Sequence, residues 1–217
     1  MNSAIILAAG DSSRMGFPKQ LAEYKGKTIL QTVVDEVTKN FEDTIVVLGH
    51  ENETLTDKIN FYNSTVIINE NWEEGIISSI RTGLFHLSSD KQIESATIFM
   101  GDQPAISSEV IQKIMNCKHY DDEVVVPQYR YQLGYPILIP RFFWNKLELI
   151  TQDDFEGTDS VYKNFELVDY LETSEIKLKI VNFNFLKPTD YDAVSYTHLR
   201  AHETPEHLVW RIHVGKK

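Results

Sequence analysis

The sequence has little cysteine, little positive charge and no long apolar run. Its one cysteine among 217 residues, Cys117, excludes an intrachain disulfide and a cysteine-rich metal site. No apolar segment approaches the roughly 20 residues that a membrane-spanning helix requires. The net charge of −11 argues against nucleic acid or an anionic membrane surface as a partner. Any anionic ligand must therefore be held by a few locally concentrated cations.

Two common nucleotide-binding signatures are also missing. The residues Gly26, Lys27 and Thr28 resemble the end of a P-loop, but Leu21 stands where that motif requires glycine. There is no GxGxxG sequence, which leaves a dinucleotide-dependent dehydrogenase as a weak alternative. The first residues lack the basic region that precedes the apolar part of a signal peptide, so we expect a cytoplasmic protein.

Short apolar segments alternate with helical patterns through the first part of the chain. Strands are expected at residues 4–8, 44–48, 65–68 and 96–100, and helices at 28–37, 76–87 and 107–115, with Ser107 as an N-cap. Strands of about five apolar residues predict burial on both faces, and their alternation with helices predicts a parallel sheet. Ligands of such sheets bind at the carboxyl ends of the strands.

The second half is less regular, with strands expected at 124–126, 136–139 and 176–185 and an aromatic-rich helix at 140–150. Overall we expect an α/β fold, a Rossmann-like three-layer αβα sandwich whose mostly parallel sheet has an antiparallel strand in the second half. Residues 1–193 are expected to form a single domain.

Residues 194–217 differ from the rest, because they carry four of the seven histidines. The stretch SYTHLRAHETPEHLVW resembles a peptide that recurs at the ends of unrelated proteins through translated adapter sequence. We therefore expect a non-native or weakly structured tail, with a genuine C-terminal helix as the alternative, and no metal site is inferred from these histidines.

The sharpest local feature is the segment LAAGDSSRMG at residues 7–16, followed by Lys19. It comes directly after a predicted strand, and its small residues allow backbone N–H groups to approach a polyanion. Arg14 offers a planar fork to phosphate oxygens, and Lys19 offers a mobile point charge. The residues expected to bind a nucleotide here are Leu7, Ala8, Ala9, Gly10, Arg14 and Lys19. An ordinary strand-to-helix turn is the simpler alternative.

Asp102 follows another predicted strand, within the sequence MGDQP at residues 100–104. Its carboxylate is therefore expected at the same edge of the sheet as the loop that carries Lys19. A hard oxygen ligand suits Mg²⁺, which takes one or two protein carboxylates together with phosphates and water. Asp102 is the expected metal ligand, and a turn with a solvated aspartate is the alternative.

These two motifs resemble the nucleotidyltransferase family that includes the molybdenum cofactor cytidylyltransferases and guanylyltransferases and the methylerythritol-phosphate cytidylyltransferases. The similarity extends through residues 46–50, 71–84 and 134–141. It implies that Gly49 and Ser79 bind the nucleotide, and that Gly134 and Pro136 lie at the acceptor. His50 is either a ligand contact or a surface residue, and Ser78 either contacts ligand or caps a helix. The guanylyltransferases have two glycines where this chain has Ala9 and Gly10, so the resemblance favours cytosine.

The resemblance implies a magnesium-dependent transfer of CMP from CTP to a molybdopterin-type acceptor, with Arg14, Lys19 and Asp102 as the catalytic residues. It also implies a molybdenum hydroxylase as a partner. Another phosphorylated acceptor, such as a sugar phosphate or methylerythritol phosphate, stays open, as does a noncatalytic cofactor-delivery factor. The chain departs from the family at Leu186, where an aspartate that helps to bind metal is usual, with Asn184 as a weak neutral substitute. It also departs at residues 153–159 in the acceptor segment.

Overall fold

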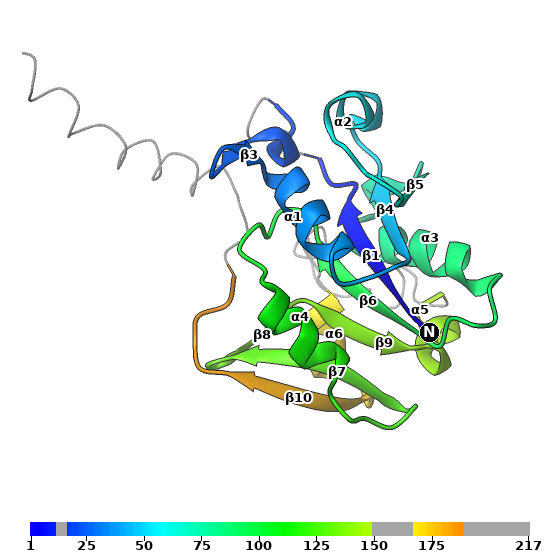
Figure 1. Ribbon diagram of the computed structural model, residues 1–217. Helices are drawn as coiled ribbons and strands as arrows, with labels where there is room; N and C mark the ends of the chain where they lie inside the picture. The colour runs from blue at the N-terminus through cyan, green and yellow to red at the C-terminus, as the bar shows by residue number, and fades with distance from the viewer. Residues whose placement is uncertain (12–16, 149–166, 189–217) are drawn as a thin grey trace, which may run out of the picture.

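A computed structural model of the chain describes residues 1–11, 17–148 and 167–188 (Figure 1). Within this part, eight strands form one sheet in the order β10-β7-β9-β6-β1-β4-β5, with the short β8 paired to β7. The strands are β1 (Asn2–Ala8), β4 (Thr44–Leu48), β5 (Thr65–Ile68), β6 (Ser95–Met100), β7 (Glu123–Tyr129), β8 (Gln132–Leu133), β9 (Ile137–Pro140) and β10 (Lys177–Phe183).

Helices cover both faces of this sheet because the side chains of β1 alternate between two apolar cores. Ile6 and its alternate neighbours pack with α1 (Ile29–Thr38) and α4 (Ser108–Met115). Ile5 and its alternate neighbours pack instead with α3 (Ile76–Ser88), α5 (Trp144–Glu148) and α6 (Leu167–Thr173) (Figure 1). The result is the expected three-layer αβα arrangement.

Strand direction decides where the ends of the strands meet. β1 runs parallel to β4 and β6, and β4 runs parallel to β5. β9 lies antiparallel between β6 and β7, and β10 is parallel to β7. The carboxyl ends of β1, β4, β5, β6, β7 and β10 therefore lie along one edge. The mostly parallel sheet with an antiparallel strand in its second half is confirmed.

The expectation that the third predicted strand, residues 65–68, is buried on both faces is wrong. β5 is the last strand of the sheet, so Thr65 and Ile68 are exposed. The expected helix at 140–150 is, in its described part, a 3₁₀ turn (Arg141–Phe143) followed by α5. Ser107 does occupy the N-cap position of α4, but its side chain makes no capping hydrogen bond.

Several short elements were not foreseen from the sequence. They are the 3₁₀ turns η2 (Lys19–Leu21) and η3 (Trp72–Glu74), the hairpin of β2 (Glu23–Tyr24) and β3 (Lys27–Thr28), and the helices α2 (Asn52–Lys58) and α6. In the described ranges, no helix combines the length and apolar character needed to cross a membrane. Cys117 is half-buried just beyond α4, with a free thiol. Residues 194–217, the expected tail, lie outside the described residues.

Candidate nucleotide-binding site

Two expected site residues, 83 positions apart in the sequence, meet in space. Lys19 begins η2 after the small-residue loop, and Asp102 lies two residues beyond the end of β6. The Nζ atom of Lys19 is 2.5 Å from Oδ2 of Asp102. Asp102 is only 6% exposed. The parallel order of β1 and β6 brings them together, because both loops leave the same edge of the sheet. Arg14 lies outside the described residues.

The second oxygen of the Asp102 carboxylate, Oδ1, is buried and has no hydrogen-bond partner among the described residues. A buried, unpartnered carboxylate oxygen is costly, and a hard cation satisfies it. Across residues 1–11, 17–148 and 167–188, no cluster of three or more His, Cys, Asp or Glu side chains is found. The donor set described therefore fits an ion whose remaining ligands are phosphates and water.

The backbone of the loop after β1 is held by its carbonyl groups. The Gly101 N–H donates to the Leu7 carbonyl at 2.8 Å, and the His50 N–H donates to the Ala9 carbonyl at 3.1 Å. The buried side-chain amide of Gln20 donates to the carbonyls of Ala8 and Gly10, at 3.3 Å each. These hydrogen bonds hold the carbonyl groups of the loop against the rest of the protein.

Glycines on the neighbouring strands allow these loops to approach each other closely. A Cβ at Gly49 would lie 2.8 Å from the Ala9 carbonyl and 2.7 Å from Cβ of Trp72. A Cβ at Gly10, by contrast, would meet no atom of the described residues within 4 Å. Gly49 is therefore required for packing beside the loop, whereas Gly10 faces open space that a ligand can occupy.

Replacement of Gly101 by Ala is expected to destabilise the protein and to disturb the site together. The added Cβ would lie 2.8 Å from the Leu7 carbonyl and 2.9 Å from Cβ of Ala8, so the loops of β1 and β6 must separate. We expect a loss of about 1–3 kcal/mol in the free energy of unfolding, measured by urea denaturation. Gly10→Ala is the matched control and should leave stability nearly unchanged. Equal stability of both variants would contradict the close packing.

Ser79 is the fourth residue of α3 and is nearly buried. Its Oγ accepts a hydrogen bond of 3.0 Å from Nδ2 of Asn69, which also donates to Oγ of Ser78 at 2.8 Å. Ser78 in turn donates to the carbonyls of Asn71 and Gly75, at 2.8 and 3.0 Å. The hydroxyl of Ser78 therefore ties the start of α3 to the preceding segment, but it does not cap the helix, because no side chain makes a capping hydrogen bond there.

His50 lies beside this region rather than apart from it. Its Nε2 is 3.6 Å from Oδ1 of Asp11, and its ring centroid is 5.0 Å from that of Trp72. The imidazole is 39% exposed. His50 thus links the loop after β1 to the segment before α3 and still faces solvent.

The expected acceptor residues lie at the same edge of the sheet. Ile137 pairs with Ile98, so Pro136 lies beside the last residues of β6, close to where the Asp102 loop begins. Gly134 is buried next to the ring of Tyr129, whose hydroxyl donates to the Tyr135 carbonyl at 2.6 Å. Burial raises the pKa of the Tyr129 phenol, which keeps this donor protonated.

The departures from the family pattern have structural counterparts. Leu186 is 69% exposed and so contributes no buried ligand. The Asn184 carbonyl accepts from Nε of Arg130 at 3.4 Å, and Phe185 packs near Tyr129 and Phe183. Tyr131 is 92% exposed, whereas Tyr129 is buried. Residues 153–159 lie outside the described residues.

Two residues of this region were missed in the sequence. Gln20 holds the loop after β1, and Asn69 holds two serines of α3. Asn69 carried a usable signal, because a polar residue that directly follows a strand lies at the ligand edge, as Asp102 does. Gln20 carried the weaker signal of a polar residue next to a candidate phosphate ligand.

The sequence of the chain is similar to those of known proteins. The chain matches the family described as the MobA-like NTP transferase domain over residues 4–168, and it belongs to that family. It is therefore a nucleotidyltransferase. A probable molybdenum cofactor guanylyltransferase of Natranaerobius thermophilus is 26% identical over 88% of this chain and 93% of its own length. The molybdenum cofactor cytidylyltransferase of Escherichia coli is 28% identical over 63% of this chain and 69% of its own length.

Solved structures support the fold. A homologue, from Mycobacterium sp. strain JC1, of the Mycobacterium tuberculosis protein Rv0371c has a TM-score of 0.76 at 22% identity, covering 93% of this chain and 96% of its own. Rv0371c itself, in complex with manganese, has a TM-score of 0.67 at 20% identity, covering 91% and 97%. At this identity the likeness concerns the fold alone.

Proposed function

We propose that the protein transfers CMP from CTP to a molybdopterin-type acceptor with release of pyrophosphate, in a reaction that depends on Mg²⁺. The observation that carries this proposal is the meeting of Lys19 with the buried Asp102 carboxylate at the edge where the loop after β1 ends. The ammonium of Lys19, the carboxylate of Asp102 and the uncrowded Gly10 thus belong to loops at the same edge of the sheet. That combination suits a triphosphate with its metal.

In this mechanism a phosphate oxygen of the acceptor attacks the α-phosphorus of CTP. The bond from that phosphorus to the oxygen bridging to the β-phosphate breaks, and pyrophosphate leaves. Lys19 and Arg14 stabilise the charge on the leaving group, and Asp102 would hold the divalent ion. The ion would supply neutralisation of the phosphate charge. A phosphate monoester is already a competent nucleophile, so catalysis rests on positioning and electrostatics.

The preference for CTP is argued from Ala9. This residue is 3% exposed, and its methyl group points to the position where Gly49 approaches the loop. The methyl group is thus buried in protein packing, and the support for CTP is the resemblance, in which the guanylyltransferases have glycine where this chain has Ala9. The relatives carry both cytidylyl- and guanylyltransferase names, so the choice of CTP over GTP is part of the proposal.

The proposed acceptor is supported by the names of the relatives and by the position of Gly134 and Pro136 beside the end of β6. The partner that receives the finished cofactor would be a molybdenum hydroxylase, the class that uses a cytosine dinucleotide form.

The test is pyrophosphate release by the purified protein with Mg²⁺ and CTP, GTP or UTP, each with and without molybdopterin-type acceptor. We expect acceptor-dependent release with CTP above the other two nucleotides, and Ala9→Gly should raise the relative rate with GTP. Binding of CTP without any release of pyrophosphate would favour a delivery factor instead. Release that requires a sugar phosphate or methylerythritol phosphate would overturn the choice of acceptor.

A further inference from the structure

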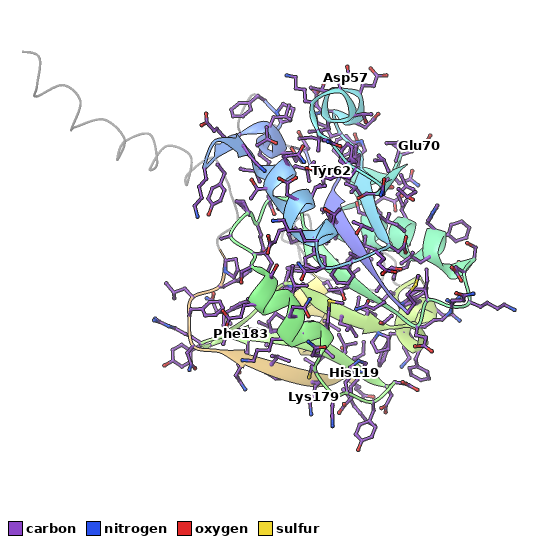
Figure 2. The ribbon with its side chains drawn as sticks, in the orientation of Figure 1. Asp57, Tyr62, Glu70, His119, Lys179 and Phe183 are labelled. Carbon is purple, nitrogen blue, oxygen red and sulfur yellow. The ribbon has the colours of Figure 1, made fainter. Side chains whose placement is uncertain are left out.

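Asn69 lies where the ends of β4 and β5 meet the start of α3. It follows β5 directly, it is 3% exposed, and its backbone N–H donates to the Leu48 carbonyl at 2.7 Å. Figure 2 labels the next residue, Glu70, on this side of the molecule, and Phe183 on β10, the strand at the opposite edge of the sheet. The position of Asn69 is therefore fixed by its burial and by its backbone hydrogen bond to β4.

The hydrogen bonds of the Asn69 side chain define the direction of its amide. Oδ1 accepts from the Asn71 N–H at 3.0 Å, so the oxygen cannot exchange places with the nitrogen without losing that bond. Nδ2 then presents its two hydrogens to Oγ of Ser78 and Oγ of Ser79. Both serine hydroxyls are thereby acceptors toward Asn69.

A hydroxyl that accepts one hydrogen bond has its own hydrogen left to donate elsewhere. Ser78 donates that hydrogen inside the protein, to the Asn71 and Gly75 carbonyls. Ser79 has no acceptor among the described residues, although it is only 4% exposed. The bond from Asn69 leaves the Ser79 hydroxyl as a donor, and a nearly buried donor of this kind is stabilised by an acceptor on a ligand or a water molecule.

The position of Ser79 agrees with a ligand contact. Gly83, one turn further along α3 on the same face, lies against β1, where a Cβ would be 2.9 Å from Cγ2 of Ile5. Ser79 lies on this same face of α3, one turn closer to the start of the helix. The segment just before α3 contains Trp72, which packs beside Gly49. The Ser79 hydroxyl is thus near the loop after β1.

We propose that Asn69 is a positioning residue that fixes the Ser79 hydroxyl as a hydrogen-bond donor to the nucleobase, and that this polarity selects cytosine over guanine. This inference rests on the proposed function. The pairing edge of cytosine carries two adjacent acceptors, N3 and O2, whereas that of guanine carries two adjacent donors, N1–H and the N2 amino group, and has its one acceptor, O6, at the far end. The Ser79 donor can therefore bond to N3 or O2 of cytosine, whereas a guanine in the same position presents N1–H or its N2 amino group. Two donors then face each other, and a buried site penalises that contact strongly.

The test compares kcat/KM and dissociation constants for CTP and GTP in three variants and one control variant. Asn69→Asp replaces the donor by an acceptor, so the Ser79 hydroxyl turns toward it, and the CTP:GTP ratio should fall by about tenfold or more. Ser79→Ala removes the donor and should lower the same ratio, and the double variant should lose no more than Ser79→Ala alone. Ser78→Ala is the matched control, because its hydroxyl donates within the protein. It should lower the melting temperature and leave the ratio unchanged.

The outcomes separate this inference from the proposed function. A protein that binds neither nucleotide would refute both. A protein that binds CTP, with an unchanged CTP:GTP ratio in Ser79→Ala, would overturn the role of Asn69 alone, and this holds even if Asn69→Asp does not fold. An equal shift of the ratio in Ser78→Ala would show that disturbance of the helix start is the cause, and it would overturn the inference as well.

Discussion

Replacing Asp102 with Asn is expected to lower kcat/KM for pyrophosphate release by roughly 10²–10³-fold. The substitution keeps the shape of the side chain and removes the charge, at a residue that is 6% exposed. The amide cannot hold a hard cation as the carboxylate does through its buried Oδ1, which has no hydrogen-bond partner in the part of the chain that the structure describes. Transition-state charge on the phosphates is then no longer neutralised at this point. Pyrophosphate release with CTP, Mg²⁺ and acceptor measures the effect.

A second readout makes the metal role independent of turnover. Binding of Mn²⁺ in the presence of a nonhydrolysable CTP analogue, followed by electron paramagnetic resonance, should weaken in Asp102→Asn. Asp35→Asn is the matched control, because Asp35 also pairs with a lysine at 2.5 Å, Lys27, on the surface of α1. Hydrogen bonds from Lys27, Gln31 and Tyr62 outweigh partial burial and lower the Asp35 pKa, so that carboxylate is already satisfied. Asp102→Asn protein that kept a third of its activity would contradict the metal role.

The meeting of Lys19 and Asp102 could be predicted from the sequence because it depends on strand order more than on side-chain detail. Two short apolar strands, each followed by small residues and one charged residue, are enough to place both charges at one edge when the sheet is parallel. The same logic places Gly49 at the end of β4. The pairing of β1 with both β4 and β6 confirms the premise.

The orientation of individual polar groups could not be predicted in the same way. Asn69 and Ser79 are ten positions apart, and their hydrogen bond exists only after β5 and α3 have packed against the same sheet. Gln20 likewise reaches the Ala8 and Gly10 carbonyls only because η2 turns the chain back beneath the loop. Such contacts depend on tertiary geometry, which periodicity and composition do not encode.

The exposure of β5 shows a related limit. An apolar strand of four residues has the same composition in the middle of a sheet and at its edge, and strand order alone decides which it is. β5 pairs with β4 on one side and ends the sheet on the other, so Ile68 is exposed despite its apolar character. A single sequence gives no direct measure of that order.

Replacing Lys19 with Met is expected to have opposite effects on two ligands of the same site. For the nucleotide, loss of the ammonium removes a partner of the phosphates, and kcat/KM for CTP should fall by roughly 10²-fold. For a free divalent ion, the ammonium 2.5 Å from Oδ2 is a competitor, since it already neutralises the Asp102 carboxylate. Its removal should strengthen Mn²⁺ binding without nucleotide by about tenfold, a modest gain because the lysine side chain is 27% exposed and its charge is screened.

Mn²⁺ titration of the nucleotide-free protein, beside CTP kinetics, decides this point. Lys27→Met is the matched control, since it breaks an ion pair of the same length with Asp35, and both measurements should stay at the values of the parent protein. If Lys19 only stabilised the fold, its loss would weaken both ligands together and lower the melting temperature. Weaker Mn²⁺ binding in Lys19→Met would therefore contradict the prediction that the Lys19 ammonium competes with the metal for the Asp102 carboxylate in the nucleotide-free protein. Stronger Mn²⁺ binding with weaker CTP use would mean that Lys19 exchanges its carboxylate partner for phosphate during each turnover.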